Sequence, residues 1–95
     1  MAEDYHKTLS RSEARYRYLH IPKADREFFP DEHVEFKIEF DGKTYDLKVN
    51  HKDDIMTGKL YELYHFLEGD RIIIKKKKKD LYSMTAPDTR PYPAN

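Results

Sequence analysis

Residues 34–49, VEFKIEFDGKTYDLKV, predict a β-hairpin that fixes the centre of a small β-rich fold. Apolar and polar side chains alternate on both sides of Asp41-Gly42, and this two-residue period indicates strands with one buried face. Asp-Gly favours a two-residue type I′ turn, which sets the register of the strands. We expect Phe36 opposite Leu47, Ile38 opposite Tyr45 and Val34 opposite Val49 in the core, with Lys37 opposite Asp46 and Glu35 opposite Lys48 on the charged face.

The segments around the hairpin predict shorter elements. Residues 16–21 are typical of a strand, and a proline on each side of residues 23–29 favours a short helix there. After the hairpin we expect a polar loop, a very short strand at residues 55–56, and a strand that starts at Arg71 and runs into the lysines. An i, i+3, i+4, i+7 spacing predicts a second short helix through Leu60, Leu63, Tyr64 and Leu67.

These elements define the expected fold class, which is mostly β (α+β). Helices this short do not provide the crossover connections that a parallel sheet needs. We therefore expect a small, mostly antiparallel barrel with two short helices at its ends. The 95 residues suffice for one such domain, which we place at residues 8–85, between a flexible N-terminus at residues 1–7 and a disordered tail or linker at residues 86–95.

The composition narrows the class of protein. The chain has no cysteine, which excludes a disulfide framework and thiolate zinc sites and favours an intracellular protein. No apolar run is long enough to span a membrane, and the N-terminus lacks the apolar segment of a signal peptide. The net charge is zero, but basic segments at residues 5–23 and 71–90 flank an acidic segment at residues 24–46. A local basic face is therefore compatible with the neutral total.

The sequence contains no group of residues typical of catalysis. Asp31 together with Asp46-Leu47-Lys48 imitates the carboxylates and lysine of a nuclease metal site, but Asp46 and Lys48 already have expected partners across the hairpin. The five histidines lack the spacing of metal ligands, and the three glycines are isolated, so no phosphate-binding loop is present. We expect a protein that is not an enzyme and that has no metal, no cofactor and no small-molecule substrate.

Two polar segments are candidates for binding. Residues 10–17, SRSEARYR, combine hydroxyl, guanidinium and phenol groups, and an arginine can bridge guanine O6 and N7 or grip a phosphate. Residues 50–54, NHKDD, offer the amide, imidazole, ammonium and carboxylate groups that contact base edges. The lysine run at residues 75–79 matches a nuclear-localisation signal or a solvated strand end, and we favour the strand end because the run continues a strand.

The order of several short motifs resembles the B-three domain, a DNA-binding fold of plant transcription factors. Leu19-His20-Ile21-Pro22-Lys23 matches the Leu-x-Ile-Pro-Lys strand of that family. Phe29-Pro30, the glycine of the hairpin turn, Thr57-Gly58 and Leu67-Glu68-Gly69-Asp70 follow in the order of the family's later motifs. The resemblance extends over residues 8–76, although the tryptophan that the family carries before its second helix is absent here.

The resemblance implies an open seven-stranded antiparallel pseudobarrel whose two arms grip the major groove, similar also to the recognition domains of some restriction endonucleases. It implies sequence-specific binding of double-stranded DNA, as a transcription regulator or as the recognition domain of a restriction-type nuclease. The first arm would be residues 10–17, and the second, which is short, residues 50–54. The implied contact residues are Ser10, Arg11, Arg15, Arg17 and Tyr18 around the first arm, Asn50, His51, Lys52 and Asp53 in the second, and Lys76 on the lysine run.

Two other functions are compatible with the sequence. The same barrel could be a protein-interaction module that uses Tyr16, Tyr18 and Tyr64. Leu-x-Ile-Pro-Lys also occurs in the swapped-hairpin dimers of bacterial transition-state regulators and antitoxins, which use a shorter segment. This chain is long enough to close its own barrel, so we expect a monomer, free-standing or joined to another domain. We expect it in the cytoplasm or nucleoid of a prokaryote, or in the nucleus of a plant.

Overall fold

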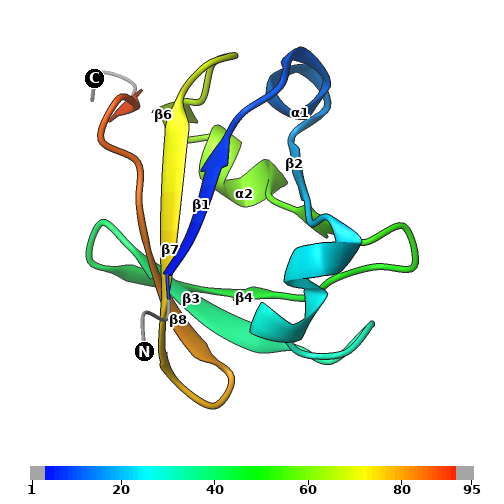
Figure 1. Cartoon of the computed structure of the whole chain (residues 1–95). Coiled ribbons are helices and arrows are strands. Elements are labelled where there is room, and N and C mark those ends of the chain that lie inside the picture. The colour runs from blue at the N-terminus through cyan, green and yellow to red at the C-terminus, as the bar shows by residue number, and fades with distance from the viewer. Residues whose placement is uncertain (1–3, 92–95) are drawn as a thin grey trace.

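The largest element of the computed structural model, which describes residues 4–91, is a mixed five-stranded sheet. Its strand order is β1-β7-β8-β3-β4 (Figure 1). All neighbouring strands are antiparallel except β3 and β8, which run parallel, so the sheet is mostly antiparallel as expected but not wholly antiparallel as the resemblance implied. The strands are β1 Asp4–Thr8, β3 Phe36–Phe40, β4 Lys43–Leu47, β7 Arg71–Lys78 and β8 Leu81–Thr85.

Two small sheets and three short helices complete the described part of the chain. Strand β2 pairs antiparallel with β5, and β6 pairs antiparallel with β9. Their bounds are β2 Tyr18–His20, β5 Asp54–Met56, β6 Tyr64–His65 and β9 Arg90–Pro91, and the helices are α1 Arg11–Tyr16, the 3₁₀ helix η1 Lys23–Phe28 and α2 Gly58–Tyr61. The fold is therefore α+β and mostly β, but with nine strands and three helices over residues 4–91 instead of seven and two.

The β3–β4 hairpin has the register expected from the sequence. Phe36 lies opposite Leu47, and Lys37 lies opposite Asp46 with an ion pair of 2.7 Å. Asp41 and Gly42 both have positive φ, 52° and 79°, as a type I′ turn requires. The expected core pair of Val34 and Val49 is wrong for Val34, whereas Val49 is buried. Strand β3 begins only at Phe36, and Val34 is 43% exposed.

Strands β1 and β9 lie within the two segments for which the sequence predicted a flexible N-terminus and a disordered tail. Residues 4–8 form β1, which pairs with residues 71–75 of β7 and buries Tyr5. Without β1 the long strand β7 would present an open edge, which native sheets avoid. Near the other end β9 pairs with β6, and Asp88 accepts two hydrogen bonds from the Arg71 guanidinium, at 2.9 and 3.0 Å. Residues 1–3 and 92–95 lie outside the described residues.

The second helix is shorter than its sequence spacing predicted. Helix α2 ends at Tyr61, and Leu63 and Leu67 are exposed, whereas Tyr64 and Phe66 are buried. Tertiary contacts account for the change, because the Tyr64 ring packs at 4.8 Å on Phe40 and its hydroxyl donates to the Asp41 carboxylate. That hydrogen bond raises the pKa of Tyr64 to about 12. No helix described in residues 4–91 is long and apolar enough to cross a membrane.

Aromatic side chains occupy the core beneath η1. The ring of Tyr82 stacks on Phe29 at 5.4 Å and meets Phe36 edge-on at 5.2 Å. The Tyr82 hydroxyl donates to the Phe28 carbonyl at 2.6 Å, so a buried polar group is satisfied. On the same sheet β7 continues through Lys78 with exposed lysines, which confirms the interpretation of the run as a solvated strand end.

The two faces of the hairpin should respond differently to truncation. Leu47→Ala removes a buried side chain and should lower the free energy of unfolding by about 2–5 kcal/mol. Lys37→Ala breaks only a solvent-screened ion pair and should cost far less. Chemical denaturation of both variants measures the difference, and equal losses would contradict the assignment of faces.

Candidate nucleic-acid interface

The first arm, residues 10–17, folds as the short helix α1. Ser10 is its N-cap: the Ser10 hydroxyl accepts from the Glu13 N–H at 3.2 Å, and the Glu13 carboxylate accepts from the Ser10 N–H at 2.9 Å. This capping box is visible in the sequence as Ser-x-x-Glu and could have predicted the helix. The expected strand over residues 16–21 is correspondingly shorter, because β2 begins at Tyr18.

Glu13 attaches the first arm to the rest of the fold. Its carboxylate accepts from the Lys7 ammonium of β1 at 2.7 Å and from the His20 N–H of β2 at 2.7 Å. Burial would raise the pKa of Glu13, but the hydrogen bonds from Lys7, Ser10 and His20 outweigh burial and hold the pKa below its ordinary value. A charged carboxylate is thus the stable form in the folded protein.

The arginines of the first arm remain on the surface. Arg11 and Arg15 are four residues apart on α1, so they share one helix face. The Arg15 guanidinium lies 5.5 Å from the centre of the Tyr16 ring. Arg17 ends the helix in the left-handed region at φ 62°, and its carbonyl accepts from the Thr57 N–H at 3.1 Å.

The second arm, residues 50–54, is a closed polar loop. The Asn50 side-chain oxygen accepts from the N–H groups of Lys52, at 2.8 Å, and of Asp54, at 3.1 Å. Asp53 accepts from the Arg26 guanidinium at 3.1 Å, and the same guanidinium donates to the Pro30 carbonyl at 3.3 Å. The side-chain oxygens of the predicted contact residues Asn50 and Asp53 therefore accept hydrogen bonds from within the protein. The side chains of His51 and Lys52 are exposed.

The two arms lie at opposite ends of the small β2–β5 sheet, hereafter the ribbon. At one end Thr57 binds the carbonyl of Arg17, and at the other the Ile21 N–H donates to the Asp53 carbonyl at 2.8 Å. Leu19 and Ile55 face each other on the buried side of the ribbon. Its outer face carries Tyr18 opposite Met56 and His20 opposite Asp54.

The charges of this surface are distributed unevenly. Each acidic residue in the arms and ribbon has a partner: Glu13 pairs with Lys7 and Asp53 with Arg26, and Asp54 is hydrogen-bonded to the His20 ring at 2.7 Å. Within residues 4–91 no carboxylate forms an ion pair with Arg11, Arg15, Arg17 or Lys52. Cationic groups without carboxylate partners therefore lie at both ends of the ribbon, although the chain as a whole is neutral.

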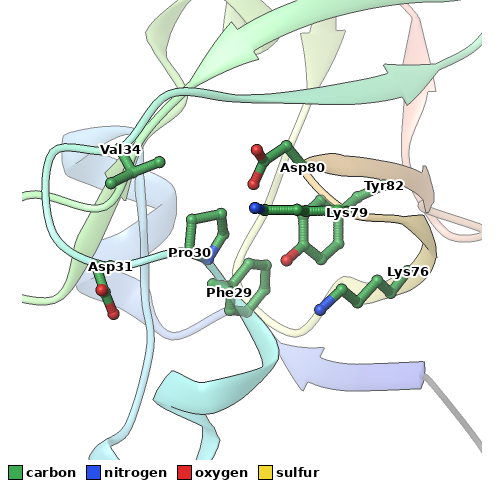
Figure 2. Close-up of a pocket in the computed structure, with 8 residues that line it drawn as sticks. All are labelled: Phe29, Pro30, Asp31, Val34, Lys76, Lys79, Asp80 and Tyr82. Carbon is green, nitrogen blue, oxygen red and sulfur yellow. The ribbon is translucent and has the colours of Figure 1, made fainter.

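Lys76 lies apart from the other predicted contact residues, in a groove of about 420 Å³ beside the β7–β8 turn. Figure 2 shows the side chains of Lys76 and Lys79 pointing toward Phe29 and Pro30 across this groove. Helix α1 and the β7–β8 turn lie at opposite ends of the molecule (Figure 1). The structure thus brings together the predicted residues of the two arms but not Lys76.

Sequence reasoning missed the outer face of the ribbon. This face carries His20, Asp54 and Met56. In the sequence His20 belonged only to the Leu-x-Ile-Pro-Lys motif and Asp54 only to the polar loop. Met56 belonged only to a very short predicted strand. The alternation of a strand could have placed Tyr18 and His20 on one face, but their partners required the β2–β5 register. In residues 4–91 no group of three or more histidine, aspartate or glutamate side chains is arranged to hold a metal ion.

Two solved structures are similar to this chain in fold. The N-terminal domain of Helicobacter pylori LlaJI.R1 superposes with a TM-score of 0.71 at 14% identity, over 87% of this chain and 85% of that chain. The hypothetical Arabidopsis thaliana protein At1g16640.1 superposes with a TM-score of 0.59 at 16% identity, over 87% of each chain. No family model and no curated protein matches the sequence. At these identities the comparisons show the fold alone, and that fold is consistent with the B-three-like resemblance.

The charge on Glu13 should make stability depend on pH. Because its pKa in the folded state lies below the ordinary value, the stabilisation by this carboxylate is present above the unfolded pKa and is lost as pH falls through the folded pKa. Glu13→Gln should lower the free energy of unfolding by about 3 kcal/mol at pH 7, since it leaves Lys7 without its partner. The difference between wild type and variant should shrink below the ordinary pKa of 4.5.

Urea denaturation of both proteins between pH 7 and pH 3 provides the measurement. Glu62→Gln, at an exposed position after α2, is the matched control and should leave the pH profile unchanged. A Glu13→Gln deficit of constant size across this range would show that the carboxylate charge does not hold the arm.

Proposed function

We propose that this domain binds double-stranded DNA with sequence preference through its two arms, as a monomer without catalytic activity of its own. It would act as a transcription regulator or as the recognition domain of a restriction-type nuclease. One observation carries the proposal: arginine and lysine side chains at both ends of the ribbon lack carboxylate partners, while every acidic residue there already has a partner within the protein.

The electrostatics favour a polyanionic ligand. Cations that already had carboxylate partners would have to lose them before a phosphate could be bound. Arg11, Arg15, Arg17 and Lys52 carry no such cost in residues 4–91, and each phosphate they neutralise would release counterions from DNA.

The spacing of the arms also suits DNA. The ribbon between them is three residues long, which corresponds to roughly 10 Å of extended strand. The major groove of B-DNA is about 12 Å wide. Two arms at this separation match the dimensions of one groove. The similarity in fold to the N-terminal domain of LlaJI.R1 is compatible with this proposal.

The backbone at Arg17 supports a role for its side chain. Residues 4–91 contain five non-glycine residues with positive φ, and the other four are aspartate or histidine, which tolerate this region. Arginine has no such preference, so its presence costs conformational energy that glycine would avoid. We infer that the guanidinium is kept at this position for binding.

The position of each remaining residue within its arm suggests which part of the DNA it would contact. Arg15 would bridge a guanine and Arg11 would contact a phosphate. In the second arm the Asn50 NH₂ group and His51 would face base edges, and Lys52 would contact phosphate. A DNA-binding role would place the protein inside the cell, in the cytoplasm, nucleoid or nucleus, alone or joined to another domain.

A protein-interaction module is the second candidate, and exposed side chains give it some support. Tyr16 is 62% exposed, and Leu63 and Leu67 are also exposed. Of the other two tyrosines expected to form such an interface, however, Tyr64 is buried and Tyr18 is partly buried.

DNA binding should depend on salt and on the arms. A random duplex library at low salt should yield a preferred site. Arg15→Ala should weaken binding by about 1–3 kcal/mol at one base position if Arg15 bridges a guanine. Arg11→Ala should weaken all duplexes alike and reduce the salt slope by about one.

Lys43→Ala is the matched control, because this exposed lysine lies at the other end of β4 from the second arm. It should change neither affinity nor preference. Electrophoretic mobility shifts at several salt concentrations measure all three variants. Binding that survives replacement of Arg11, Arg15 and Lys52 together would refute the two-arm proposal, as would the absence of binding to any duplex.

The monomeric state can be tested separately. The chain completes its own hairpin and its own five-stranded sheet, so no strand remains to be supplied by a second copy. Sedimentation equilibrium at micromolar concentration should give a single species near 11.5 kDa. A stable dimer would favour the swapped-hairpin regulators instead.

A further inference from the structure

Met56 is exposed to solvent at the first-arm end of the ribbon, where it lines a shallow groove with Asn50 and the Glu35, Asp46 and Lys48 side chains of the hairpin. It is 55% exposed, and it belongs to five large apolar side chains that are exposed in residues 4–91. Of the other four, Tyr16 belongs to the first arm, whereas Val34, Leu63 and Leu67 belong neither to the arms nor to the ribbon strands. An exposed apolar side chain gains nothing from solvent, so this position suits a ligand that is itself apolar at one point.

The register of the ribbon fixes the surroundings of Met56. Tyr18 lies directly opposite it on β2, with its ring partly buried, so the two side chains form an apolar half of the outer face. The other half is the His20–Asp54 pair, which is hydrogen-bonded within itself at 2.7 Å. The first arm adjoins the Met56 end of this face, because the Thr57 N–H binds the Arg17 carbonyl.

We propose that Met56, backed by Tyr18, contacts the C5-methyl group of a pyrimidine in the major groove of the bound DNA. This inference rests on the proposed function and adds to it a specificity-determining contact on the ribbon, between the arms. The ligand chemistry is a methyl group on pyrimidine C5, which is carried by thymine and by 5-methylcytosine.

The chemistry of the groove supports this assignment. The major groove is lined by hydrogen-bonding groups at every base pair, and the C5-methyl of thymine is its distinctive apolar feature. A methionine side chain is flexible and polarisable, so it can fit against one methyl group without a preformed pocket. Arginines of the first arm would bind the neighbouring phosphate or guanine and bring the methyl group against Met56.

The test removes the methyl group and nothing else. In the preferred duplex each thymine is replaced in turn by uracil, which keeps every hydrogen-bonding group of the base. The wild-type protein should bind one of these duplexes roughly fourfold more weakly, the loss that corresponds to burial of about one methyl group. If the contacted base is a cytosine, replacement by 5-methylcytosine should strengthen binding by a similar factor and so identify the other source of the methyl.

Variants connect the effect to the side chain. Met56→Gln keeps the length of the side chain but makes it polar, and it should bind thymine and uracil duplexes equally. Met56→Leu should keep most of the discrimination. Leu67→Gln, which alters a similarly exposed apolar side chain on the segment after α2, should keep all of it. Thermal unfolding of each variant verifies that it is folded.

The possible results separate the two proposals. Duplex binding in which no position depends on a C5-methyl group would overturn the methyl contact and leave the two-arm function standing. The same conclusion follows if the dependence persists in Met56→Gln. Failure of every duplex to bind would overturn both. A methyl effect at one position that disappears in Met56→Gln and persists in Leu67→Gln would establish the contact.

Discussion

A single buried carboxylate holds the first arm in its position. Glu13 lies where β1, α1 and β2 meet, and it accepts hydrogen bonds from an ammonium group and two backbone N–H groups. Lys7 supplies the ammonium from a strand near the N-terminus, so the placement of the arm depends on β1 being in the sheet. The neighbouring arginines can remain unpaired because this acid has its own cation and is turned inward.

Local chemistry explains which parts of the fold were predictable. The β3–β4 hairpin follows from a two-residue alternation and a turn dipeptide, both of which act over a few residues. The second helix was overextended because the leucine spacing ignored the long-range packing of Tyr64 on Phe40. Strand β1 was missed because it has only one deeply buried side chain, Tyr5, and is defined by its pairing with β7.

The two candidate arms could be delimited in the sequence, but their conformation could not be predicted. Composition marks both segments as polar, yet it does not reveal that Asp53 is held by Arg26, and it does not show how Ser10 is used in the helix cap. These polar groups have the right chemistry for DNA and are used within the protein. The ribbon face was missed for the opposite reason, since Met56 has no binding signature of its own and becomes notable only through its neighbours across β2 and β5.

The hydrogen bonds of the second arm bear on how such a domain could change its target. The Asn50 N–H donates to the Asp54 carbonyl at 2.9 Å, and the Asp53 N–H donates to the Asn50 carbonyl at 3.0 Å, so the loop is closed at its base by its own main chain. Only His51 and Lys52 lie between these closing contacts. Residues could be exchanged or inserted there during evolution or by grafting while the sheet stays intact, so the loop is a replaceable module on an unchanged frame.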